Sequence, residues 1–111
     1  MSTVTTHVLD TSRGRPAAGV TVRLDRVVDA TAQPLAQATT DGDGRIAEIG
    51  PENAPAGHYR LVFGSGDYFA THGQQTFYPY VTVDFDIADP HQHYHVPLLL
   101  SPYGFTTYRG S

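Results

Sequence analysis

Turn-forming residues interrupt this chain at short intervals, and this rhythm constrains the fold more than any other feature. Clusters of Gly, Pro, Asn or Asp fall at residues 13–16, 41–44, 50–57, 89–90 and 101–102. Between them lie short runs rich in Val, Thr, Tyr and Leu, residues that favour strands. We therefore expect a single all-β domain over residues 1–111, built as a sandwich or barrel.

The runs between the turns predict about eight strands and one short helix. The expected strands are residues 4–10, 20–28, 35–40, 45–49, 58–63, 80–87, 93–100 and 105–109. The helix is expected at Asp67 to Gly73, because Tyr68, Phe69 and His72 have helical spacing.

Alternation along the strands separates a core face from an outer face. The predicted core positions are Val4, Thr6 and Val8 in one strand and Tyr94, Val96, Leu98 and Leu100 in another. The opposite faces carry Thr5, His7 and Leu9, and His93, His95, Pro97 and Leu99. These outer faces are half apolar, which indicates a surface covered by a partner subunit. In the last strand, the same alternation puts Thr106 and Tyr108 on one face.

Composition excludes several classes of protein. Net charge is −4, all seven basic residues are arginines, and no basic patch marks a nucleic-acid binder. No run approaches the roughly 18 apolar residues that span a membrane. Residues 1–6 lack the basic and apolar regions of a signal peptide, so we expect a cytoplasmic protein. Cysteine is absent, which excludes disulfides and thiolate chemistry.

Histidine and arginine provide the candidate chemistry. His93 and His95 share a strand face about 7 Å apart, a spacing that suits zinc if His7 or Asp89 supplies a third ligand. Two ordinary surface histidines fit the same spacing. Arg45 follows the turn Asp41-Gly-Asp-Gly, which could present its guanidinium to a carboxylate, although an ordinary turn arginine also fits.

The C-terminus is unusual because an apolar strand pattern continues through Tyr103, Phe105 and Tyr108 almost to the last residue. Most domains end in disposable polar residues. We therefore expect this end to be held in the structure, with Arg109 as a candidate ligand for an anion.

Taken together, the motifs resemble the 5-hydroxyisourate hydrolases, transthyretin-like enzymes of purine catabolism. The matching segments are Thr6–Asp10, Gly14–Ala17, Thr40–Arg45, Tyr78–Pro79, His93–Pro102 and Tyr108–Ser111. The last of these is the most specific, because it separates the hydrolases from the hormone-carrier transthyretins of the same fold. The resemblance implies a transthyretin-like sandwich of two four-stranded sheets with one short helix. It also implies a homotetramer with its sites at the dimer–dimer interface.

The activity implied by the resemblance is hydrolysis of 5-hydroxyisourate to 2-oxo-4-hydroxy-4-carboxy-5-ureidoimidazoline in urate degradation. The implied catalytic residues are His7, Arg45 and His95, and the implied substrate-binding residues are Thr106, Tyr108, Arg109, Gly110 and Ser111. A neutral imidazole suits the activation of water at pH 7. No cofactor or metal is implied, and a metal at the histidines would inhibit by occupying the base. A transthyretin-like carrier of a small ligand, without catalysis, is the alternative.

Overall fold

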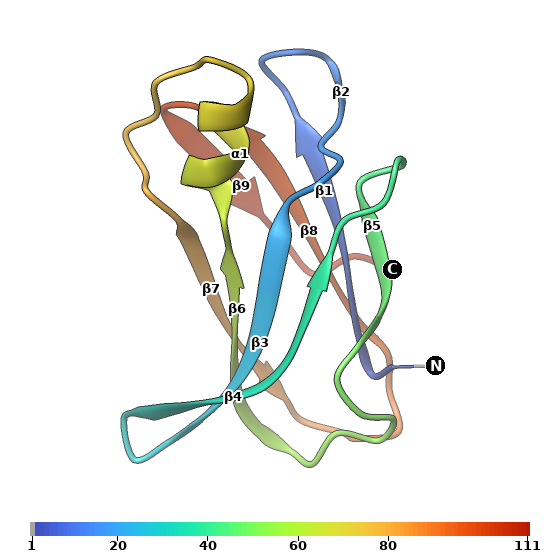
Figure 1. The fold of residues 1–111 in the computed structure, drawn as a ribbon. Helices are drawn as coiled ribbons and strands as arrows, with labels where there is room; N and C mark the ends of the chain where they lie inside the picture. Colours follow the sequence, from blue (N-terminus) through green and yellow to red (C-terminus); the bar gives the residue numbers. More distant parts are fainter. Residues whose placement is uncertain (1) are drawn as a thin grey trace.

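The computed structural model describes residues 2–111, which form a sandwich of two β-sheets (Figure 1). In chain order the elements are β1 (Val4–Asp10), β2 (Arg15–Pro16), β3 (Thr21–Val28), β4 (Thr31–Thr39), β5 (Arg45–Ile49), β6 (Gly57–Phe63), α1 (Ser65–Thr71), β7 (Val81–Ile87), β8 (Tyr94–Ser101) and β9 (Gly104–Thr107). The predicted all-β sandwich with one short helix is confirmed.

The two sheets differ in how their strands pair. In the first sheet, β1 pairs in parallel with β8, and β9 lies beyond β8. On its other side β1 pairs antiparallel with β5 and with the two-residue β2. The second sheet is antiparallel throughout, in the order β4-β3-β6-β7. The prediction of two four-stranded sheets therefore holds, with β2 as a short addition to the first.

The core lies between the sheets, on the faces that alternation predicted. Val96, Leu98 and Leu100 of β8 are at most 6% exposed, and Val4 and Val8 of β1 are at most 1% exposed. The first sheet packs on Leu24, Leu61, Phe63 and other apolar residues of the second. His7, Leu9, His95 and Leu99 are half-buried on the opposite face of the first sheet. Because the apolar side chains of β1 and β8 must be buried, the opposite face of each strand is the one on which a functional site can form.

Helix α1 begins at Ser65 and ends at Thr71, two residues earlier at each end than expected. Gly73, predicted to lie inside the helix, instead ends it with a φ of 67°. The amide of Gly73 donates to the Ala70 carbonyl and that of Gln74 to the Phe69 carbonyl, which is a Schellman motif. Burial raises the pKa of Tyr68 to about 12, and its hydroxyl donates to the buried Asp10 carboxylate at 2.7 Å. This bond ties the helix to the end of β1.

Three differences from the predicted strands are larger than a shift of one residue. Strand β4 begins at Thr31, before Pro34, and proline is tolerated there because β4 is an edge strand with a register shift opposite Pro34. Strand β2 has only two residues and lies within the predicted turn at 13–16, so no local pattern marks it as a strand. Strand β9 ends at Thr107, before the expected Arg109. Within residues 2–111, no helix is long and apolar enough to cross a membrane.

Candidate functional site

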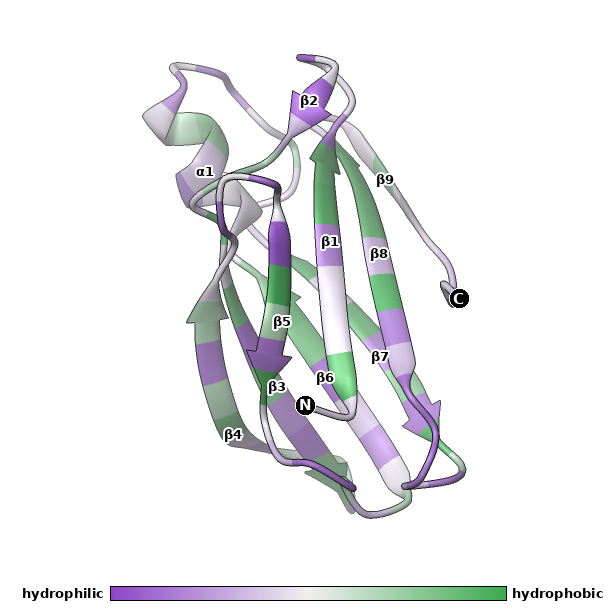
Figure 2. Cartoon of the chain, turned by 90° about the vertical axis from the view of Figure 1, so that its right-hand side faces the viewer, coloured by the Kyte–Doolittle hydropathy of each residue, from purple (hydrophilic) through white to green (hydrophobic). Residues whose placement is uncertain are grey.

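Three strands of the first sheet bring the candidate residues together on its outer face. Figure 2 shows β5, β1 and β8 side by side, in that order. The register places His7 of β1 opposite Arg45 of β5, and Thr5 of β1 opposite His95 of β8. Directly opposed residues have Cβ atoms about 5 Å apart. Two segments separated by about ninety residues thus contribute to one site.

Arg45 is presented by a turn that Asp41 and Gly44 hold in place. The Asp41 carboxylate accepts hydrogen bonds from the amides of Asp43 and Arg45, at 2.9 and 3.0 Å. The bond from the Arg45 amide is the main reason that the pKa of Asp41 lies below its usual value. Gly44 has a φ of 73°, and a Cβ there would lie 2.3 Å from the Val8 carbonyl oxygen. The turn therefore needs glycine at this position.

A cavity of about 230 Å³ opens beside these strands. Its lining residues are Thr5, Thr6, Arg45, Ile46, Ala47, His93, His95 and Ser111. Two of the three predicted catalytic residues, Arg45 and His95, thus share a cavity with the predicted Ser111. His7 is not among the lining residues, but it is adjacent to Arg45 in the sheet and is close enough to His95 to interact with it electrostatically. Among residues 2–111, the Arg45 side chain forms no hydrogen bond or ion pair, although its charge helps to lower the pKa of Asp41.

Thr5 links the two histidines of the cavity, a role that the sequence did not reveal. Its Oγ1 lies 2.8 Å from Nε2 of His93 and 2.8 Å from Nδ1 of His95. Alternation placed Thr5 on the outer face, but a threonine in a strand carries no signal of its own. Only the parallel register of β1 with β8 aligns it with His95.

His95 is held in the state that a general base needs at neutral pH. Burial lowers the pKa of its imidazole below 6.5, and repulsion by the nearby Arg45 guanidinium, and by His93 and His7 whenever they are protonated, lowers it further. The ring is therefore neutral at pH 7 and can accept a proton. Since Nδ1 is engaged by Thr5, Nε2 is the ring nitrogen left for a reacting water molecule.

The C-terminal segment folds back against His95. The Gly110 amide donates to the His95 carbonyl at 2.8 Å, which forms an isolated β-bridge between the two residues. A Cβ on Gly110 would lie 2.6 Å from Cδ2 of His95, so glycine is the residue that fits against this ring. Ser111 follows and lines the cavity. The expectation that the C-terminus is held in the structure is confirmed.

Tyr108 and Arg109 lie elsewhere than the strand phase suggested. Both line a separate groove of about 330 Å³ between the edges of the two sheets. The Arg109 guanidinium stacks on Tyr94 at 4.4 Å and donates to Gln92 Oε1 and the His93 carbonyl. The alternation that paired Tyr108 with Thr106 fails because β9 ends at Thr107. Thr106 itself pairs with Leu99, on the same face as His95.

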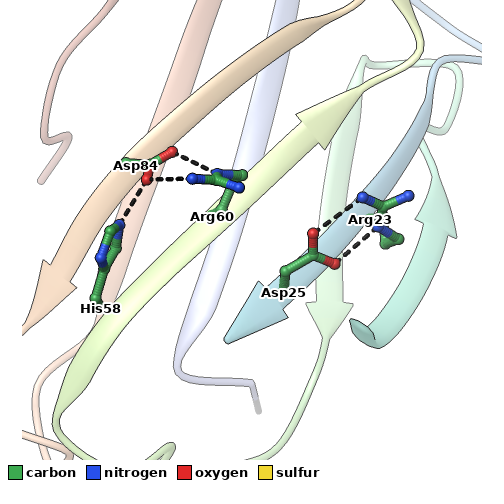
Figure 3. Close-up of polar contacts among 5 residues, drawn as sticks. All are labelled: Arg23, Asp25, His58, Arg60 and Asp84. Atoms are coloured by element: carbon green, nitrogen blue, oxygen red, sulfur yellow. Dashed lines mark hydrogen bonds and ion pairs between the residues drawn. The ribbon is translucent and has the colours of Figure 1, made fainter. Parts of the chain in front are cut away.

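Two charged clusters on the second sheet are paired internally, unlike Arg45. Figure 3 shows Arg23 bound to Asp25, and both His58 and Arg60 bound to Asp84. The shortest contacts are 2.7, 2.6 and 2.8 Å, respectively. These ion pairs stabilise the outer face of that sheet. Because the charges in them already have partners, they are less free to bind a ligand. The first sheet is therefore the better candidate site.

The metal alternative depends on a third ligand beside His93 and His95. In the part of the chain that the structure describes, no group of three or more His, Asp or Glu side chains is arranged to hold a metal ion. Neither His7 nor Asp89 completes such a group with the two histidines. The residue that joins the two rings is Thr5, which hydrogen-bonds to both.

The family model described as HIUase/Transthyretin matches residues 4–110. The chain belongs to this family. A 5-hydroxyisourate hydrolase of Caulobacter vibrioides is 47% identical over the whole of both chains. The solved structure of Klebsiella pneumoniae 5-hydroxyisourate hydrolase is 42% identical with a TM-score of 0.87, over 97% of this chain and 98% of that one. The resemblance noted from the sequence motifs is confirmed.

Backbone similarity does not separate the two branches of this family. Sea bream transthyretin, solved in complex with thyroxine, is 32% identical with a TM-score of 0.91, over 96% of this chain and 93% of that one. A fold can carry unrelated functions, so the side chains of the site must decide between them. The side chains that bear on this choice are His7, Arg45, His95 and the C-terminal residues beside them.

Proposed function

We propose that this protein hydrolyses 5-hydroxyisourate to 2-oxo-4-hydroxy-4-carboxy-5-ureidoimidazoline in urate degradation. One observation carries the proposal: a neutral His95 and an unpaired Arg45 share one cavity with Ser111. A base and a fixed cation in one small cavity suit the addition of water to a ring carbonyl. The 47% identity to the Caulobacter vibrioides hydrolase supports the choice of substrate.

In the proposed mechanism, the histidines activate water and the arginine stabilises charge. His95, with His7 beside Arg45, removes a proton from water as the oxygen attacks a carbonyl carbon of the substrate ring. Negative charge develops on the carbonyl oxygen, and the Arg45 guanidinium stabilises it with its fixed donors. As the intermediate collapses, the ring C–N bond breaks and the protonated histidine gives its proton to the leaving nitrogen. Ser111 and the Gly110 backbone position the substrate against His95. No covalent intermediate and no metal step are needed for this sequence of events.

Three further C-terminal residues are proposed to act on substrate binding less directly than Gly110 and Ser111. They are Thr106, Tyr108 and Arg109. Thr106 lies on the face of His95, farther along the sheet. Arg109 anchors the C-terminal segment through Gln92 and Tyr94, and this anchor keeps Gly110 against His95. Tyr108 is more than half exposed and is available to narrow a channel formed with another subunit.

We further propose that the chain forms a homotetramer with its sites at the dimer–dimer interface. Leu9 and Leu99 lie side by side on the outer face of the first sheet, next to the histidines. An apolar pair beside a polar site suits burial under a partner subunit. Light scattering during gel filtration should give about 48 kDa, four times the 12.1 kDa of one chain. A cytoplasmic location is part of the same proposal, and cell fractionation tests it.

The test of the activity is optical. 5-Hydroxyisourate is generated freshly from urate with urate oxidase, and its ultraviolet decay is followed with and without the protein. We expect faster decay with the protein. Decay at the spontaneous rate, together with tight binding of an aromatic ligand such as thyroxine, would favour the carrier alternative.

The site assignment is tested separately. His7→Ala and His95→Ala should each lower kcat/KM by about 10² to 10⁴, the range for a general base. Arg45→Ala should lower it by about 10² to 10³. Arg60→Ala, in the paired cluster of the second sheet, and His91→Ala, in an exposed loop, are matched controls that should keep normal turnover. Normal turnover in all three site variants would refute the assignment even if the activity is real.

A further inference from the structure

The hydroxyl of Thr5 lies between two histidine rings, 2.8 Å from Nε2 of His93 and 2.8 Å from Nδ1 of His95. A hydroxyl has one hydrogen and two lone pairs, so it donates to one ring and accepts from the other. When both rings are neutral, one must therefore present an N–H to Thr5 and the other a lone pair. The protonation of His93 and that of His95 are linked through this single group.

Two arrangements of the hydrogens satisfy these bonds. In the first, Nδ1–H of His95 donates to Thr5, and Thr5 donates to Nε2 of His93. Nε2 of His95 then keeps its lone pair. In the second, Nε2–H of His93 donates to Thr5, Thr5 donates to Nδ1 of His95, and the hydrogen of His95 is on Nε2. Only the first arrangement leaves His95 able to take a proton from water.

The surroundings of the two rings favour different charges. His95 is half-buried and faces Arg45 of β5 and His7 of β1, which disfavour a positive charge on it. His93 is exposed, so water solvates a charge there. Thr5 is 8% exposed, and its buried position limits the access of water that could replace the hydroxyl between the rings. Transfer of a proton from His95 outward to His93 is therefore favourable in free energy.

We propose, on the basis of the function proposed above, that Thr5 is a positioning residue that links His95 to His93 as a proton relay. Water gives a proton to Nε2 of His95 while its oxygen bonds to the substrate carbonyl carbon. The Nδ1 proton of His95 then moves to Oγ1 of Thr5, and the original Thr5 proton moves to Nε2 of His93. Thr5 ends with one hydrogen, His95 is neutral, and His93 carries the positive charge. The reverse transfer then returns a proton to Nδ1 of His95. Nε2 of His95 gives its proton to the ring nitrogen as the C–N bond of the tetrahedral intermediate breaks, and this restores the first arrangement.

The main test compares Thr5→Val, which keeps the branched shape, with Thr5→Ser, which keeps the hydroxyl. Nitrogen-15 NMR of the imidazole rings reports the tautomer of each histidine. We expect His95 to be in the Nδ1–H form in the wild type and in Thr5→Ser, and to lose that preference in Thr5→Val. In Thr5→Val, kcat should fall about tenfold or more, the range for groups that orient a functional histidine, with little change in KM.

The pH profile separates the relay from a merely structural role. In the wild type, protonation of His93 makes Nε2–H donate to Thr5, which forces His95 into its inactive tautomer. When Thr5 lacks its hydroxyl, protonation of His93 no longer changes the tautomer of His95. The acid limb of kcat/KM should therefore move to lower pH in Thr5→Val and stay in place in Thr5→Ser. An equal loss of activity in both variants, or an unmoved acid limb with unchanged tautomers in Thr5→Val, would overturn the relay.

A second variant tests the relay from its exposed end, where folding is not at risk. His93→Phe cannot accept the Thr5 proton and should also lower kcat about tenfold or more. His91→Phe is the matched control, because His91 is also exposed, two residues away, and the hydroxyl of Thr5 is bonded to His93 and His95 instead. Normal kcat in His93→Phe would contradict the relay. If the wild type does not hydrolyse 5-hydroxyisourate, the proposed function fails, while the NMR tautomers still decide whether Thr5 links the rings.

Discussion

Replacing Gly110 with alanine tests how closely the C-terminal segment must pack against the candidate base. The added Cβ would lie 2.6 Å from Cδ2 and 3.3 Å from Cγ of His95, and 3.2 Å from Cγ of Pro97. Carbon atoms in contact are about 3.5–4.0 Å apart, so something must move by about 1 Å. Thr5 holds the His95 ring at Nδ1, and the Gly110 amide is bound to the His95 carbonyl. Either the ring leaves Thr5 or the C-terminal segment leaves the cavity.

Both movements disturb the site and leave the core untouched. A displacement of about 1 Å in a catalytic arrangement can cost about 10²-fold in rate, which corresponds to about 2.7 kcal/mol of transition-state stabilisation. We therefore expect Gly110→Ala to lower kcat/KM about a hundredfold. The melting temperature should change little, because Gly110 lies outside the hydrophobic core and its backbone φ is not in the left-handed region.

The assay is the ultraviolet decay of 5-hydroxyisourate, run beside thermal unfolding followed by circular dichroism. Gly104→Ala is the matched control, because Gly104 begins β9 and an added Cβ meets only Ser101 Oγ, at an ordinary 3.8 Å. This variant should keep normal activity. Full activity in Gly110→Ala would refute the reasoning that the C-terminal segment is fitted to His95. Equal losses in both variants would point to a general disturbance of the β8–β9 hairpin.

Four further predictions concern the base, the helix anchor, the turn and the C-terminal segment. Burial lowers the pKa of His95, and protonation of the linked His93–His95 pair leaves no base for water, so kcat/KM should fall on the acid side of neutral pH. Tyr68→Phe removes a buried hydrogen bond to Asp10 and should lower the free energy of unfolding in urea by about 1–3 kcal/mol. Gly44→Ala should lower the same quantity by about 2–3 kcal/mol, because alanine is strained at a φ of 73° and would displace the Val8 carbonyl. Deletion of residues 108–111 should abolish hydrolysis while the circular dichroism spectrum of the sandwich is retained.

Much of the fold could be predicted from local patterns. Turn clusters separated the strands, and alternation in β1 and β8 identified the buried faces, because a strand between a core and an outer surface must alternate. The boundaries of β4 and α1 were predicted wrongly because they depend on more than the pattern within one element. Pro34 is tolerated only because β4 is an edge strand, and Gly73 ends α1 where spacing alone predicted that the helix continues. Edge position and helix capping depend on neighbours that a single strand or helix pattern does not contain.

The amino-acid sequence by itself determined the sandwich, its core faces and the membership of the family, because periodicity and motifs are properties of the chain. It also singled out His95 and Arg45, which do share a cavity. Only the tertiary structure decided that Thr5 joins His93 to His95 and that Arg109 stacks on Tyr94 away from them. The physical reason is register: β1 and β8 pair in parallel across some ninety residues of chain, and no local pattern states which residues then lie opposite each other.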